Sequence, residues 1–141
     1  MNTPVSFKLA KLLKDKNLKI DTDEVLFYRD EINNIEEHQI KNRDVIYRAD
    51  FSYIVDENEY QTYTIAEVVM WLYEKHSIWI SIDWTPQNNG DEYPFKVFWY
   101  YFVSEKIGNP ENTIDNVDET EFNSPTEAYE AAIEYCLNKL I

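Results

Sequence analysis

Apolar positions in the chain follow helical spacing in some stretches and alternate strictly in others, and residues 64–84 show both patterns in succession. Thr64-x-x-Glu67 is a capping box, in which each side chain satisfies a free backbone amide of a first helical turn. A dense apolar stripe follows at helical spacing: Ile65, Val68, Val69 and Leu72. After Lys75-His76-Ser77 the chain becomes rich in isoleucine and tryptophan up to Trp84, which indicates a strand. This stretch predicts a core helix and a strand that follows it directly.

Two further helices are predicted near the ends of the sequence. Thr3-Pro4 places a side-chain oxygen at an N-cap and proline at the first helical position, ahead of an apolar stripe that reaches Leu13. Ser124-Pro125-Thr126-Glu127 combines an N-cap, a first-position proline and a capping-box glutamate. The alanines that follow it suit close packing of this helix on a sheet.

Four strands are predicted from residue patterns of period two. They cover residues 24–30, 45–55, 78–84 and 95–103, of which the second alternates over eleven residues and the last is apolar on both faces. Polar residues 31–44 indicate a loop, and residues 105–123 form an acidic loop with six acids against Lys106, a local charge of −5. The order α-β-β-α-β-β-α predicts a single α+β domain over residues 1–141, with a mainly antiparallel sheet and helices mostly on one face.

Composition narrows the class further. The 141 residues are 44% hydrophobic and 16% aromatic, with one cysteine and a net charge of −14. Residues 1–20 carry five lysines against Asp15, a local +4 that leaves −18 for the remainder. Such acidity argues against direct binding to nucleic acid, which needs a basic surface. Without an apolar run typical of a signal peptide or a membrane span, we expect a cytoplasmic protein that does not bind membranes.

Several common catalytic and cofactor motifs are missing from the sequence. Gly90 and Gly108 are the only glycines, which excludes a P-loop and a G-x-G-x-x-G dinucleotide site. No serine lies in G-x-S-x-G, and neither His38 nor His76 lies in H-E-x-x-H. We therefore expect no enzyme, no metal and no cofactor.

Individual reactive residues have structural interpretations. Cys136 falls on the apolar side of the last helix, where a thiol is buried and inert. His76 ends the central helix, where an imidazolium suits the negative end of the helix dipole. Asp50 and Asp83 are expected on one sheet, where they could line a binding groove.

Aromatic and acidic residues supply the candidate binding surface. Rings on adjacent hairpin strands can stack on sugars or bases or anchor a protein interface, although large aromatics more often lie in the core. The acidic loop adds carboxylates that suit a basic partner. The candidate residues are Trp79, Trp84, Trp99, Tyr101, Glu111, Asp115, Asp118, Glu119 and Glu121.

Several segments resemble short uncharacterised proteins of gut Bacteroidales and their phages. The similarity lies in TIAEVVMWLYEKH followed by IWIS, in SPTEAYEAAIEYCLNKLI, and in TPVSFKLAKLL near the start. These segments cover a little under half of the chain. The resemblance implies a small accessory protein carried by a phage or prophage, and it implies no activity and no functional residues.

Three functional hypotheses follow. The leading one is a non-enzymatic, acidic interaction protein that binds a host protein, of basic character, through its acidic or aromatic surface. The first alternative is a binder of a small ligand, such as a sugar or a nucleotide-like molecule, which uses the aromatic residues of the sheet. The second alternative is a homo-oligomeric structural component that pairs exposed strands.

Overall fold

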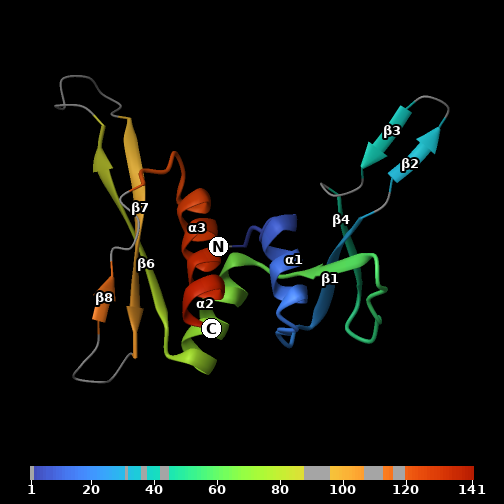
Figure 1. Ribbon diagram of the computed structural model, residues 1–141, viewed down its shortest axis with the longest axis horizontal. Helices are drawn as coiled ribbons and strands as arrows, with labels where there is room; N and C mark the ends of the chain where they lie inside the picture. Colours follow the sequence, from blue (N-terminus) through green and yellow to red (C-terminus); the bar gives the residue numbers. More distant parts are fainter. Residues whose placement is uncertain are drawn as a thin grey trace. The chain divides into compact units, whose positions relative to one another are not determined.

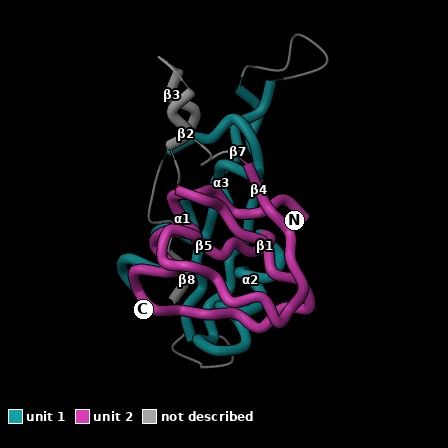
Figure 2. Tube along the Cα trace, turned by 90° about the vertical axis from the view of Figure 1, so that its right-hand side faces the viewer, with its two compact units in different colours: residues 1, 65–141 teal, residues 2–64 magenta. Residues whose placement is uncertain are grey.

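The computed structural model describes residues 2–30, 32–35, 38–41, 45–87, 96–106, 113–115 and 120–141, and for residues 32–35, 38–41 and 113–115 it describes the backbone alone. The chain groups into two compact units, unit 2 with residues 2–64 and unit 1 with residues 65–141 (Figure 2). The expectation of one domain stays a prediction.

Unit 2 contains one helix and a three-stranded antiparallel sheet (Figure 1), besides a two-stranded hairpin. The helix is α1 (Phe7–Asp15), and the strand order is β4 (Ile46–Asp50), β1 (Glu24–Arg29), β5 (Glu59–Thr62). β1 is central, and its residues 25–28 are all buried: Phe7 of α1 packs against Tyr28 on one face, and Tyr53 stacks on Phe27 on the other.

The first helix begins later than the sequence predicts. Its N-cap is Ser6, whose hydroxyl accepts from the Leu9 N–H, and not Thr3. Pro4 instead forms a β-bridge with Thr64, and the buried Val5 donates its N–H to the Tyr63 carbonyl at 2.8 Å. This pairing keeps residues 4 and 5 extended, so the favourable Thr-Pro start is overridden by tertiary contacts.

The strand predicted over residues 45–55 is also shorter in the structure. β4 ends at Asp50, because the Asp50 carboxylate accepts from both the N–H (3.0 Å) and the hydroxyl (2.8 Å) of Ser52. These two bonds lower the pKa of Asp50 and close a turn at residues 51 and 52. Phe51 in this turn and Ile54 after it lie outside the sheet and are 71% and 85% exposed.

Residues 31–44 contain a hairpin where a loop was predicted. β2 (Ile32–Ile35) pairs antiparallel with β3 (His38–Lys41), in a register that sets Ile32 opposite Lys41. The segment is polar and short, so its pattern resembles a loop, whereas the ladder between its own two halves makes it a hairpin.

Unit 1 contains two helices that pack on one face of a sheet (Figure 1). Its elements are α2 (Ile65–His76), β6 (Trp79–Pro86), β7 (Val97–Glu105), β8 (Thr113–Asp115), α3 (Pro125–Tyr135) and a π-helical turn, Cys136–Leu140. β7 pairs with β6 on one side and with β8 on the other, so the predicted acidic loop includes a short strand.

Both helix starts in unit 1 match their sequence signals. α2 begins directly after Thr64, and Ser124 caps α3 by accepting from the Glu127 N–H at 3.2 Å, while the Glu127 carboxylate accepts from the Asn123 N–H. Ser77, at φ 53°, turns the chain from α2 into β6. Buried isoleucine, valine and alanine side chains fill the space between these helices and β6-β7.

The α+β class is confirmed, as is the order of its main elements, with β2, β3, β5 and β8 added between them. Among the described residues, no helix has the length and apolar character needed to cross a membrane.

Candidate functional site

The sheet of unit 1 has one face under its helices and one face that we call the open face. Alternation along β6 and β7 places on the open face Trp79, Ser81, Asp83, Phe98, Tyr100 and Phe102. In the described part of unit 1, α2 and α3 both lie against the opposite face (Figure 1). Within the described residues, the open face is therefore an aromatic surface without a helical cover.

Exposure and ring contacts define this surface more closely. Trp79 is 37% exposed and packs edge-on against Tyr73 of α2, with ring centroids 5.7 Å apart. Tyr100 and Phe102 are half-buried, and their rings meet edge-on at 5.3 Å. Burial and the negative charge of Asp83, directly opposite in the β6-β7 register, raise the pKa of Tyr100. The result is a row of fixed rings beside one exposed carboxylate.

The four predicted aromatic residues divide between the two faces. Trp79 lies on the open face, whereas Trp84, Trp99 and Tyr101 lie on the face that the helices cover. Tyr101 is 2% exposed, Trp99 is half-buried, and Trp84 remains 51% exposed. Tyr101 is therefore a core residue and cannot contact a ligand without rearrangement of the core.

Sequence reasoning missed three rings of the open face: Phe98, Tyr100 and Phe102. The signal was present in the pattern, because residues 95–103 are apolar on both faces. Tryptophan content favoured Trp99 as a candidate, but Trp99 lies on the face of β7 that the helices cover.

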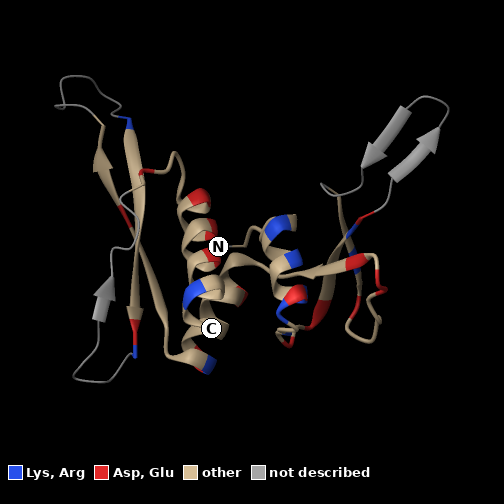
Figure 3. Cartoon of the chain, viewed as in Figure 1, with Lys and Arg blue, Asp and Glu red and all other residues tan. Residues whose placement is uncertain are grey.

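Two of the predicted acidic site residues, Asp115 and Glu121, lie in the described part of the chain. Glu121 is exposed, and Asp115 lies in β8 opposite Val103. Glu111, Asp118 and Glu119 lie outside the described residues. In the described part, acidic side chains recur along α3 and lysines along α1 (Figure 3).

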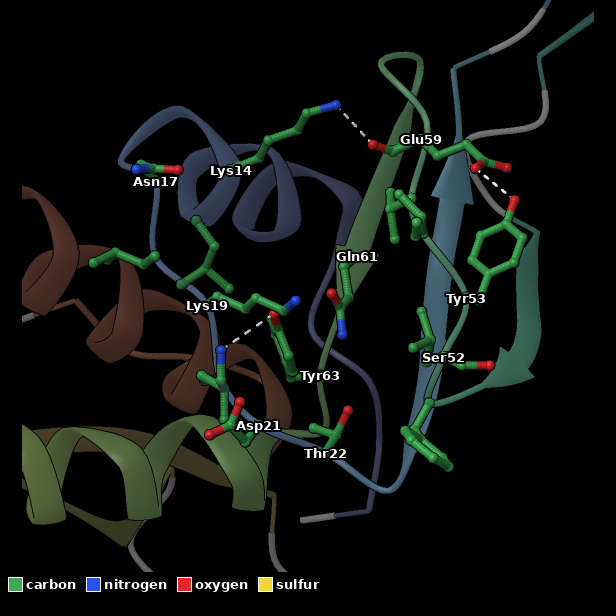
Figure 4. Close-up of a pocket in the computed structure, with 17 residues that line it drawn as sticks. Lys14, Asn17, Lys19, Asp21, Thr22, Ser52, Tyr53, Glu59, Gln61 and Tyr63 are labelled. Carbon is green, nitrogen blue, oxygen red and sulfur yellow. Dashed lines mark hydrogen bonds between the residues drawn. The ribbon is translucent and has the colours of Figure 1, made fainter.

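Unit 2 contains a cavity of about 540 Å³ that no residue of the predicted surface lines (Figure 4). Its walls come from three segments: the end of α1 with the chain up to β1, residues 51–55, and β5. Its lining residues include Lys14, Lys19, Ile54, Glu59 and Gln61.

A buried carboxylate stabilises one wall of this cavity. Glu59 is 3% exposed and accepts from the Tyr53 hydroxyl (2.7 Å), the Asp56 N–H (2.9 Å) and Arg29 Nε (3.0 Å). Burial raises the pKa of Glu59, but the three donors outweigh it, and the net pKa lies below the ordinary value. Glu59 is thus ionised and fully satisfied, which makes it a structural group.

Lys14 is also engaged within the unit. Its ammonium donates to the carbonyls of Asp56, Glu57 and Glu59, and it lies 4.4 Å from the centre of the Tyr60 ring. These contacts fasten the end of α1 to the turn before β5. Lys14 therefore holds the cavity together while adding positive charge to its wall.

The remaining candidate residues behave as follows. Cys136 is fully buried, and burial together with the nearby Glu105 charge raises its pKa to about 12, which agrees with an inert thiol. His76 is the last residue of α2 and packs edge-on against Trp71. Asp50 and Asp83 lie in different sheets, β4 and β6, so the predicted groove between them on one sheet is wrong.

Among the described residues, no three potential metal-binding side chains cluster. No family model, no curated protein and no solved structure matches this chain.

Proposed function

We propose that the protein acts by binding a basic protein partner through the open face of unit 1. The observation that carries the proposal is the row of rings on β6 and β7 with no described helix over it, flanked by the exposed Asp83. Aromatic residues are enriched at the centres of protein interfaces because they bury a large area at a low entropic cost.

The negative charge of the protein indicates a partner of opposite charge. The chain carries −14, and Asp83 lies among the rings of the open face. Opposite potential speeds the encounter of two proteins and disfavours partners of like charge. A surface that combines aromatic rings with a carboxylate, on an acidic protein, therefore suits a basic partner whose surface can pack against aromatic rings.

The proposal is tested by quantitative capture from a cell lysate followed by reconstitution with the purified partner. Trp79→Ser removes the most exposed ring of the face, and Asp83→Lys reverses its charge. We expect each substitution to weaken binding by at least about tenfold, since interface anchors contribute about 2 kcal/mol or more. Raised salt should weaken the wild-type complex as well.

Trp84→Ser is the matched control, because Trp84 is an exposed tryptophan of the same strand on the other face. A partner that binds all three variants as it binds the wild type contradicts the proposal. Equal loss with Trp84→Ser and Trp79→Ser would also contradict it, since binding would then not depend on the open face. Homo-oligomerisation through the same face is distinguished by the mass of the protein in solution.

A further inference from the structure

The cavity of unit 2 has the dimensions of a small-molecule site. Its volume of about 540 Å³ lies within the range of roughly 300–1,000 Å³ that is usual for ligand pockets. Three separate segments line it, and they are tied together by the contacts of Lys14 and Glu59 described above. A ligand would thus meet a wall that is already formed.

One part of the cavity lining is apolar and unusually exposed. Phe51 and Ile54 line the cavity while remaining 71% and 85% exposed, and Leu18, Ile20 and Val55 continue the apolar lining. The Asp50–Ser52 turn holds Phe51 away from the sheet. Adjacent exposed apolar side chains beside a cavity are typical of a surface that covers a ligand.

The charged part of the lining favours an anion. The lining includes Lys14 and Lys19 together with the carboxylates of Asp21 and Glu59, and Glu59 is paired with Arg29, which lies outside the lining. With Glu59 already paired, Asp21 is the one lining carboxylate left beside the two lysines, on a chain whose net charge is −14. Because Lys14 is bound to three carbonyls, Lys19 is the ammonium best placed to meet a ligand.

Gln61 supplies a neutral polar group beside this charge. It is half-buried on β5, and within the described part of the chain its side chain makes no hydrogen bond. In Figure 4 the side chains of Lys19 and Gln61 point toward one another. An amide in this position can donate to an anionic oxygen that Lys19 holds.

From this arrangement we propose that unit 2 binds a small amphipathic monoanion. Its apolar body lies against Ile54, Val55 and Phe51, and its anionic group lies at Lys19 and Gln61. The site is on a different unit from the open face, so it neither needs nor weakens the proposed protein partner.

Two fluorescent probes that share their aromatic rings separate the two halves of the site. Anilinonaphthalene sulfonate carries one negative charge, and N-phenylnaphthylamine carries none. We expect each to bind the intact full-length protein at one saturable site. Lys19→Gln should weaken the sulfonate probe by about fivefold, the value of an exposed ion pair at its upper limit, and change the neutral probe less than twofold.

Ile54→Asp tests the apolar side with little risk to folding, because Ile54 is 85% exposed. We expect it to weaken both probes by about fivefold or more, through loss of apolar contact. Lys11→Gln, an exposed lysine of α1 outside the lining, and Trp79→Ser, on the open face, should change neither.

The proposal is overturned if neither probe binds, if Lys19→Gln affects both probes equally or neither of them, or if Ile54→Asp has no effect. Binding that Trp79→Ser removes and Ile54→Asp leaves intact would place the probes on the open face. Thermal unfolding of each variant shows that it is folded during the titration.

Discussion

Replacing Glu59 by alanine tests whether the buried carboxylate holds unit 2 together. The substitution removes the acceptor of Tyr53, Asp56 and Arg29 at once. Hydrogen bonds to charged groups contribute about 1.5–3 kcal/mol each, and removing one partner of a buried ion pair costs about 3–5 kcal/mol.

The structure places the expected cost of Glu59→Ala at the lower end of the range of about 3–5 kcal/mol for a broken buried ion pair. The Arg29 side chain is 34% exposed and Tyr53 is half-buried, so both can recover hydrogen bonds to water. Deleting Glu59 also removes the cost of burying its own charge. We therefore expect Glu59→Ala to lower the free energy of unfolding by about 3 kcal/mol.

Glu24→Ala is the matched control, because Glu24 also begins a strand of the same sheet and also pairs with an arginine. That pair, with Arg48 at 3.1 Å, is exposed, with 69% and 51% of the two side chains accessible. Exposed pairs contribute little, so this variant should lose less than about 0.5 kcal/mol.

The assay follows urea unfolding by far-ultraviolet circular dichroism, with hydrogen exchange of β1 and β5 peptides as the local readout. All four tryptophans lie in unit 1, so their fluorescence separates an effect on that unit from an effect on unit 2. Equal destabilisation by Glu59→Ala and Glu24→Ala would contradict this prediction, and so would unchanged exchange in β5.

Three further predictions rest on single groups. The folded-state pKa of Glu59 lies below its ordinary value of 4.5, so the stability that Glu59 contributes is complete above pH 4.5 and is lost as the pH falls through the folded pKa. The stability of the wild type should therefore fall more steeply with acid than that of Glu59→Gln. Parallel acid-unfolding curves for the two proteins would contradict this. With its pKa raised to about 12, Cys136 should react with iodoacetamide at pH 8 roughly a thousandfold more slowly than a free thiol, and rapid labelling before urea is added would show an open core. Ser124→Ala should lower the free energy of unfolding by about 1 kcal/mol through loss of the α3 cap, whereas Thr126→Ala, inside the first turn, should leave it nearly unchanged; equal effects would mean that the cap contributes nothing.

Where signals were local, sequence reasoning located the elements well. Ser124 caps α3 by accepting from an N–H three residues along the chain, and the capping-box residues Thr64 and Glu67 lie within four residues of the start of α2. Spacing within one helix likewise predicts that Val68 and Leu72 share a buried face. Such interactions can be recognised in the sequence because they need no distant partner.

Tertiary contacts decided the elements where the sequence prediction failed. Thr3-Pro4 lost its helical role because Pro4 pairs with Thr64, sixty positions away in the chain. Phe51 left its predicted strand through the Asp50–Ser52 turn, which alternation of apolar residues does not reveal. In each case a competing bond overrode the local pattern.

The candidate sites likewise depend partly on local sequence pattern and partly on tertiary contacts. Alternation along residues 95–103 already indicated a second apolar face, but only packing shows that the helices cover Tyr101 and leave Tyr100 and Phe102 on the other side. The cavity of unit 2 could not be predicted, because Lys19, Ile54 and Gln61 meet only when the sheet pairs β1 with both β4 and β5. Periodicity determines which face of an element is apolar; the pairing of distant strands decides which faces are covered and which segments enclose a cavity.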